Sequence, residues 1–276
     1  MALGIIGGSG LYALPGLQEP EWRAAWTPWG APSDALLHGR IGDTRLVFLP
    51  RHGRGHPLAP SELNARANIA ALKAAGCTAI LSLAACGSFR EVLPPGSFVA
   101  VDQIVDRTRG RANSFFGDGI VAHVSLAEPM CPRLRSGVVA HGAIDGGTYL
   151  AIEGPQFSTR AESKLYRAAG MDVIGMTAMP EAALAREAEL CYQTVAMVTD
   201  FDSWHEGPAV DVAQVVAVLA ANAERARALI VAFAAGWREA PCACHHALDH
   251  AVITDRAAWP AATVARLQGI AGRVLA

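Results

Sequence analysis

The hydrophobic positions of the chain fall into short apolar runs separated by longer amphipathic stretches. The runs predict strands over residues 3–6, 44–49, 79–85, 172–176 and 192–198. A continuous apolar run such as the third of these is typical of a strand buried on both faces of a largely parallel sheet. Because ligands of open α/β sheets bind where strands end in loops, the loops that follow these runs are the places to search for chemistry.

Apolar residues at helical spacing occupy several stretches between the strands. Residues 61–75 predict a helix, and Gly76 follows at the position of a C-terminal glycine cap. Thr159 and Glu162 have the spacing of a capping box, which predicts a helix that ends near residue 169. These helices alternate with the strands along the chain.

Two further helices complete the pattern. Residues 180–190 are expected to be helical, and a stripe on one face of a later, long helix consists of Val212, Val215, Val216, Leu219, Ile230 and Phe233. The alternation predicts a single α/β domain over 1–276, in which helices cover both faces of a mostly parallel or mixed central sheet as three α/β/α layers. We expect residues 240–276 to be helical and to pack on this domain.

Composition narrows the class of protein. Hydrophobic residues make up 52% of the 276 residues and charged residues only 17%, which excludes intrinsic disorder. The net charge is −2 without a block of like charges, so we expect neither a nucleic-acid nor a membrane partner, but a small molecule. The first residues show no basic stretch ahead of an apolar one, and no run is long enough to span a membrane, so we expect a cytoplasmic protein.

Two loops have the chemistry of an anion site. Residues 7–10 read Gly-Gly-Ser-Gly, which allows backbone N–H groups and the Ser9 hydroxyl to approach a phosphate closely. Arg51 offers a guanidinium fork that can bind phosphate through two hydrogen bonds, and His52 offers a neighbouring donor. An ordinary tight turn and a solvated Arg-His pair are the alternative interpretations.

Two more loops suit a flat ligand and its sugar. Phe157 follows a Gly-Pro turn at 154–155, where an aromatic ring can stack on a nucleobase or simply pack under the loop. Residues 176–181 end a strand at the beginning of a helix, and helix N-termini bind anions and hydroxyl groups.

The last strand is followed by two carboxylates, Asp200 and Asp202. Side chains at this spacing can converge on the hydrogen-bond donors of a heterocycle, act as acid and base, or bind a metal. Two solvated loop aspartates would have the same spacing. His205 and Glu206 add no recognisable ligand spacing, which disfavours the metal.

The cysteines are the last candidates for chemistry. Cys242 and Cys244 precede two histidines, but a structural zinc site needs a second pair of ligands, and only His250 lies nearby in the sequence. We therefore expect no metal, and we interpret this segment as packing or as a labile thiol pair. The other four cysteines lie in or beside apolar segments and are expected to be small buried side chains rather than a secreted disulfide framework.

In their order along the chain, these motifs closely resemble the trimeric purine nucleoside phosphorylase family. The resemblance spans residues 3 to about 235 and rests on Gly-Gly-Ser-Gly at 7–10, Arg-His-Gly at 51–53, Ala-Cys-Gly-Ser at 85–88, Glu-Gly-Pro-Gln-Phe-Ser at 153–158, Met-Thr at 176–177 with Pro-Glu at 180–181, and Thr-Asp-Phe-Asp at 199–202. It implies the fold of that family and phosphorolysis of a purine nucleoside to the free base and a ribose 1-phosphate. It also implies that inorganic phosphate is a co-substrate and that no metal or organic cofactor is used.

The resemblance also implies roles for individual residues. It implies that phosphate is bound by Ser9, Arg51, His52 and Thr177, with backbone help near Ala85. It implies that Phe157 stacks on the base, that Met176 lies against the ribose, and that Asp200 and Asp202 face the purine ring. Asp200, when protonated, would act as the general acid that neutralises the departing base.

One position departs from the family pattern: Ala84 stands where methylthioadenosine-cleaving members carry a threonine, so one phosphate-binding hydroxyl is missing. His123 and the residues after it match the segment that closes the pocket of a neighbouring subunit, which implies a trimer or a pair of trimers.

Val212, Val215 and Val216 offer an apolar surface to the 5′ substituent. Together with Asp200, they favour S-methyl-5′-thioadenosine as substrate. The alternatives are a 6-oxopurine nucleoside or S-methyl-5′-thioinosine as substrate and, more remotely, a nucleoside-binding module without catalysis.

Overall fold

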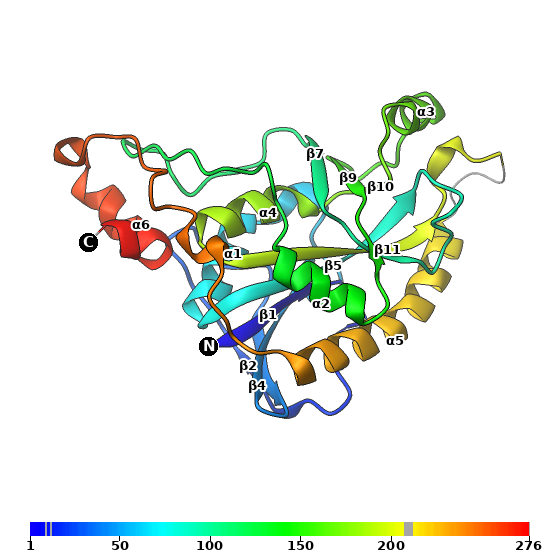
Figure 1. Cartoon of the computed structure of the whole chain (residues 1–276), viewed down its shortest axis with the longest axis horizontal. Helices are drawn as coiled ribbons and strands as arrows, with labels where there is room; N and C mark the ends of the chain where they lie inside the picture. Colours follow the sequence, from blue (N-terminus) through cyan, green and yellow to red (C-terminus); the bar gives the residue numbers. More distant parts are fainter. Residues whose placement is uncertain (9, 12, 207–211, 276) are drawn as a thin grey trace.

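The computed structural model describes residues 1–276 except 9, 12, 207–211 and 276. Its centre is a mixed sheet of eleven strands, flanked by helices on both faces (Figure 1). One path through the sheet follows the order β2-β3-β4-β1-β5-β10-β9-β7, and β11 pairs with β5 and β6. The strands are β1 (Ala2–Gly7), β2 (Gln18–Arg23), β3 (Leu36–Ile41), β4 (Thr44–Pro50), β5 (Cys77–Ser88), β6 (Phe98–Ala100), β7 (Gln103–Arg107), β8 (Ile144–Asp145), β9 (Thr148–Ile152), β10 (Val173–Gly175) and β11 (Cys191–Asp200).

The centre of the sheet is parallel. β4, β1, β5 and β11 are paired in parallel, whereas β2, β3, β6 and β10 each form an antiparallel pair with a neighbour. Parallel strands of this kind require cover on both faces, which explains why their sequences are mostly apolar. All residues of β1 are buried.

Alternate residues of the central strands serve two separate cores. In β5, Ile80 and Ala84 belong to one core, and Leu81 and Leu83 to the other. The first core contains residues of α1 (Ala65–Ala74), α4 (Ala178–Glu187) and α6 (Ala261–Leu275), and the second contains residues of α2 (Pro132–Ala140) and α5 (Val212–Gly236). Because successive side chains of these strands point to opposite faces, each face of the sheet has its own core and its own layer of helices. These are the three layers that the sequence predicts.

The predicted helices form, and the first of them begins later than predicted. Residues 61–75 divide into a short 3₁₀ helix (Pro60–Glu62) and α1, because the side chain of Asn64 caps α1 by accepting a hydrogen bond from the backbone of Ala67. The capping box at Thr159 begins α3 (Arg160–Ala168) as predicted. The helix expected over 180–190 lies within α4 (Ala178–Glu187); because Met179 has extended backbone angles, the continuous helix begins at Pro180, as predicted, and it ends at Glu187.

The apolar stripe of α5 is buried in the later part of the helix and exposed in its first turns. Ile230 and Phe233 lie in the second core, but Val212 and Val216 are 62% and 57% exposed. The first two turns of the helix therefore do not face the core, in contrast to the single stripe that the sequence suggests.

The C-terminal residues after α5 pass from the second core, which contains Cys244, to the first core, which contains Leu248 and Ala251. They contain 3₁₀ helices over Ala243–His246 and Arg256–Ala258 before α6. Leu267 and Ile270 of α6 join the first core, where α6 contacts α1. Among the described residues, no helix is both long and apolar enough to cross a membrane.

Candidate active site

A cavity of about 440 Å³ lies where the central parallel strands end. Its walls come from the loops after β1, β4, β5, β10 and β11 and from the start of α5. Of the predicted site residues, it brings together Arg51, His52, Ala85, Phe157, Met176, Thr177, Asp200, Asp202, Val212 and Val215. The ends of β1, β4, β5 and β11 meet here because the carboxyl ends of parallel strands share one edge of a sheet.

Two predicted site residues are not part of this set. Ser9 lies outside the described residues, although its neighbour Gly8 lines the cavity. His123 is exposed, its backbone N–H donates to the carbonyl of Ala251, and it is not one of the residues that line the cavity.

Arg51 is held at one end of the cavity by a buried hydrogen-bond network. Its Nε lies 2.6 Å from Oε1 of Glu181, and Nη2 lies 3.3 Å from Oε2 of the same carboxylate. Nη1 donates to the carbonyl of Leu83 at 2.8 Å, and Nη2 also donates to the Ser82 hydroxyl at 2.6 Å. Burial alone would lower the pKa of Arg51, but the facing Glu181 carboxylate raises it, so the guanidinium stays charged.

This network changes the expected role of the Arg51 fork. The edge of the guanidinium expected to bind phosphate through two hydrogen bonds is engaged by Glu181. With four hydrogen bonds made inside the protein, one of the five N–H groups remains for a ligand. The side chain thus offers a fixed positive charge and a single donor.

His52 lies beside this charge in its neutral form. Its Nδ1 is 2.9 Å from the carbonyl of Leu58, so Nδ1 carries the proton and Nε2 has a lone pair. Burial and then the charge of Arg51 lower the pKa of His52 to about 4. A neutral imidazole of this tautomer accepts a hydrogen bond at Nε2 from a hydroxyl group, such as that of a protonated phosphate.

Asp200 and Asp202 line another part of the cavity. Asp200 accepts hydrogen bonds from the Thr199 hydroxyl and from the backbone N–H of Asp202, both at 2.8 Å. Asp202 accepts a hydrogen bond from the Ser163 hydroxyl at 2.5 Å. Burial raises the pKa of both carboxyl groups, although these hydrogen bonds oppose the shift. A buried carboxyl group with a raised pKa can donate a proton to a ligand.

Gly87 makes room for this pair of carboxylates. It lies opposite Asp200 in the register of β5 and β11. A Cβ atom at this position would lie 3.0 Å from Oδ1 of Asp200 and 3.2 Å from Cβ of Asp202. Gly87 therefore leaves space for the two carboxyl groups that a larger residue would occupy.

Sequence reasoning missed two residues that position the site. Glu181 was quoted only as part of a motif, because the local sequence does not show that its carboxylate faces Arg51, 130 residues away. Arg111 was not considered: its Nη1 donates to the carbonyls of Met176 and Met179 at 2.6 and 2.9 Å, and its Nε lies 3.1 Å from Glu153. It joins the loop before Phe157 to the loop that contains Thr177.

The rim of the cavity is apolar and open. Phe157 is 47% exposed, and Val212 and Val216 on the first turns of α5 are more exposed still. A purine ring and an apolar substituent could cover these side chains, and so could a second protein chain.

The chain matches one family over most of its length. A model described as the phosphorylase superfamily matches residues 2–235. The S-methyl-5′-thioadenosine phosphorylase of Cereibacter sphaeroides is 52% identical over 287 residues, which cover 99% of this chain and 98% of that protein. The corresponding protein of Bradyrhizobium diazoefficiens is 53% identical over 284 residues, with the same coverage of both chains.

Solved structures agree with these matches. A methylthioadenosine phosphorylase from an antarctic soil metagenomic library has a TM-score of 0.92 and 43% identity, covering 97% of this chain and 98% of that one. A methylthioadenosine phosphorylase from Schistosoma mansoni in complex with adenine has a TM-score of 0.81 and 40% identity, covering 87% and 93%. The chain therefore belongs to the phosphorylase superfamily, within the group that contains these S-methyl-5′-thioadenosine phosphorylases.

Proposed function

We propose that the protein cleaves S-methyl-5′-thioadenosine with inorganic phosphate, giving adenine and S-methyl-5-thioribose 1-phosphate. The observation that carries this proposal is the combination, in one cavity, of a fixed guanidinium at Arg51 and a buried acid at Asp200. The sequence identity to phosphorylases of this name supports the same reaction.

Phosphate is expected at the Arg51 end of the cavity. Arg51 supplies charge and one donor, and His52 Nε2 accepts a hydrogen bond from a phosphate hydroxyl. Thr177 is buried and lines the same cavity, three residues before the continuous part of α4, and its hydroxyl can donate a hydrogen bond to phosphate. Because cleavage of the glycosidic bond makes the sugar cationic, an anion held beneath the anomeric carbon stabilises the transition state by position and charge.

The purine is expected at the Asp200 end, stacked on Phe157. As the glycosidic bond breaks, the bond's electron pair moves into the purine ring. A protonated Asp200 can hydrogen-bond to a nitrogen of the five-membered ring or transfer a proton to it, a general-acid effect of about 10²–10⁴ in rate. Asp202 accepts from the exocyclic amine, and Met176 lies against the ribose.

The 5′-methylthio group is expected on the apolar surface of Val212 and Val215. We propose a homotrimer in which His123 of a neighbouring copy closes this open rim, because His123 is exposed and the valines at the rim lack full cover in one chain. We further propose that phosphate is the co-substrate and that no organic cofactor takes part.

The test is release of free base from four nucleosides, with and without phosphate, after extensive dialysis of the protein. S-methyl-5′-thioadenosine should be cleaved only with phosphate, and about ten- to hundredfold faster than adenosine, because a 5′-hydroxyl without a partner costs about 1–3 kcal/mol in an apolar site. Faster cleavage of inosine or S-methyl-5′-thioinosine would make the protein a 6-oxopurine enzyme. Binding of nucleoside without release of base would indicate a non-catalytic module.

A further inference from the structure

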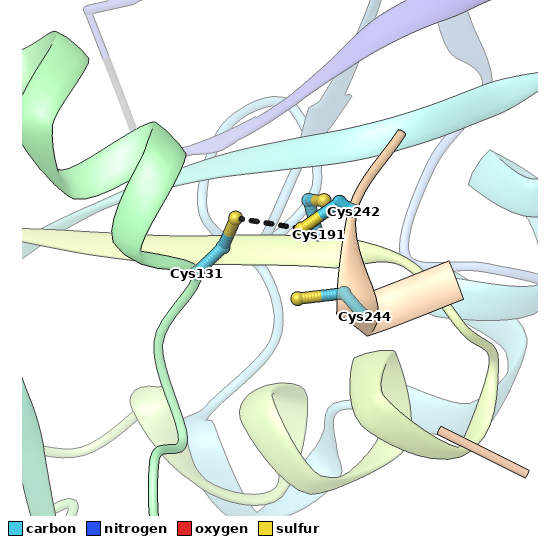
Figure 2. Close-up of side chains that lie close together, drawn as sticks. All are labelled: Cys131, Cys191, Cys242 and Cys244. Atoms are coloured by element: carbon cyan, nitrogen blue, oxygen red, sulfur yellow. Dashed lines mark hydrogen bonds between the residues drawn. The ribbon is translucent and has the colours of Figure 1, made fainter. Parts of the chain in front are cut away.

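Four cysteines from three distant segments meet at the other end of the sheet from the cavity. Cys131 precedes α2, and Cys191 is the first residue of β11. Cys242 immediately precedes the 3₁₀ helix after α5, and Cys244 lies within it. Their sulfur atoms all lie within 4.8 Å of one another (Figure 2). Cys131, Cys191 and Cys244 are buried, and Cys242 is partly exposed. We call these residues the four-cysteine cluster.

The spacing of the sulfur atoms fits a tetrahedral metal. With Zn–S bonds of about 2.3 Å, the sulfur atoms of a tetrahedral site are about 3.8 Å apart. The Sγ atoms of Cys131 and Cys242 are 3.7 Å apart (Figure 2). A disulfide would instead bring one pair to about 2.05 Å. All four cysteines are free thiols in the structure.

The surroundings suit a site with excess negative charge. Four thiolates around a divalent ion leave a net charge of about −2, which neighbouring donors must compensate. Nη2 of Arg133 donates to Cys191 Sγ at 3.7 Å, and Nε2 of His245 lies 3.5 Å from the same sulfur. Arg133 is itself held over the ring of Trp237 at 4.4 Å and donates to the carbonyl of Arg238.

We propose that the four-cysteine cluster binds a zinc ion as a closed, structural tetrathiolate site. Each thiol loses its proton to solvent on binding, and the metal keeps its charge throughout. The expectation of no metal rested on the absence of a second ligand pair near Cys242 and Cys244. Folding provides that pair as Cys131 and Cys191, from more than fifty residues away in the sequence.

The site has a structural rather than a catalytic role. Cys191 and Asp200 are the two ends of β11, a separation of about 30 Å at about 3.3 Å per residue. The ion would fasten the segment after α5 to the first residue of β11 and to the residue before α2. That segment leads to α6, which covers part of the first core.

The first experiment measures metal and thiols in wild-type protein purified without added metal. We expect about one zinc per chain, as a closed site of four thiolates requires. After denaturation with a chelator and without reductant, we expect all six cysteines to react with a thiol reagent. Zinc-free protein in which only Cys77 and Cys86 react would show two disulfides and overturn the proposal. Zinc-free protein with six reactive thiols would overturn it as well.

The second experiment uses a matched pair of variants. Cys242→Ser with Cys244→Ser should lose the zinc and lower Tm by on the order of 10 °C. Cys77→Ala, at a buried cysteine outside the cluster, should keep the zinc at the wild-type ratio. Retention of stoichiometric zinc by the double variant would contradict the assignment.

The third experiment does not depend on how the variants fold. Zinc is removed from wild-type protein with a chelator under reducing conditions and replaced by Co²⁺. Tetrahedral thiolate ligation should give intense visible absorption with sulfur-to-cobalt charge transfer, reversed by one equivalent of Zn²⁺. The weak spectrum of six-coordinate Co²⁺ would refute a tetrathiolate site.

Discussion

The carboxylate of Glu181 binds the guanidinium of Arg51 through both oxygens, and the two side chains are 3% and 2% exposed. The hydroxyl groups of Ser82 and Tyr192 also donate to Glu181, each at 2.9 Å. The positive charge at the phosphate end of the cavity is therefore oriented by the protein before any ligand arrives. Removal of Glu181 would leave a buried charge that only an anionic ligand could compensate.

The first prediction follows from this pair. Glu181→Gln should lower the free energy of unfolding by about 3–5 kcal/mol in phosphate-free buffer, the usual loss when one partner of a buried ion pair is removed. Phosphate should restore more stability in the variant than in wild type, because the anion compensates Arg51 directly. Chemical denaturation with and without phosphate measures both effects.

Glu187→Gln is the matched control. Glu187 is also a buried carboxylate on α4, but its described partners are the hydroxyl of Ser114 and the backbone N–H of Phe115 rather than a cation. Burial raises the pKa of Glu187, so the neutral amide should cost less there. Equal losses in both variants, or an equal response to phosphate, would count against the role assigned to Glu181.

A second prediction concerns Ala84, which lines the cavity beside the carbonyl of Leu83 that binds Arg51. Ala84→Ser adds a hydroxyl where related enzymes carry one, and a net hydrogen bond of about 1 kcal/mol should lower KM for phosphate about fivefold. Ala84→Cys has nearly the same size and only a weak donor, so it should leave this KM near the wild-type value. Steady-state kinetics with varied phosphate decide between the two, and KM for the nucleoside should not change.

The third prediction is a pH dependence of stability. The pKa of His52 is about 4 in the folded protein and about 6.5 in the unfolded chain. As pH falls from 6.5 to 4, the unfolded chain takes up a proton that folded His52 does not, so stability falls over this window by about 3 kcal/mol. The contribution is fully present above pH 6.5.

Denaturation of wild type and His52→Gln in phosphate-free buffer isolates this effect from the carboxyl groups. As the pH is lowered, the unfolding free energy of wild type should fall more than that of His52→Gln. A difference that stays constant between pH 7 and pH 4 would show that His52 is not held neutral by burial.

The strands predicted from sequence, β1, β4, β5, β10 and β11, each contain an apolar run; β3, β6, β7 and β9 were not predicted, although β9 (Thr-Tyr-Leu-Ala-Ile) is also largely apolar and buried. β1, β5 and β11 are buried on both faces, and their apolar runs reveal them. β2 was missed because all six of its residues are exposed, and its sequence, Gln-Glu-Pro-Glu-Trp-Arg, contains no apolar alternation. β8 has two residues and no pattern at all.

The site also has a part that could be predicted from sequence and a part that could not. The loops after the strand ends could be located because the carboxyl ends of parallel strands lie at one edge of the sheet. Most of the predicted site residues line the cavity there. Contacts between distant segments could not be located: Arg51 and Glu181 are 130 residues apart, and the cysteines of the cluster come from three segments. Local pattern carries no information about such pairs.

The last prediction tests the base-recognition end through Asp200. A carboxyl group here, with a pKa raised by burial, donates to the ring when protonated, and its partner Asp202 accepts from a 6-amino group. A 6-oxopurine presents an acceptor and a ring N–H instead, and sites built around such hydrogen bonds can reject the wrong partner by about 10⁴-fold. Asp200→Asn should narrow or reverse the preference for the aminopurine, because the amide donates to an oxo group while its carbonyl accepts from the ring N–H.

The measurement is kcat/KM for S-methyl-5′-thioadenosine and S-methyl-5′-thioinosine in both proteins. Thr199 donates to Asp200, so Thr199→Val serves as a control that disturbs the same carboxyl group without changing its donor pattern toward the base. It should lower both rates together and leave their ratio unchanged. If Asp200→Asn lowers both rates by the same factor, Asp200 contributes to catalysis but does not select the base, and selection must reside in Asp202 or in the loop that carries Phe157.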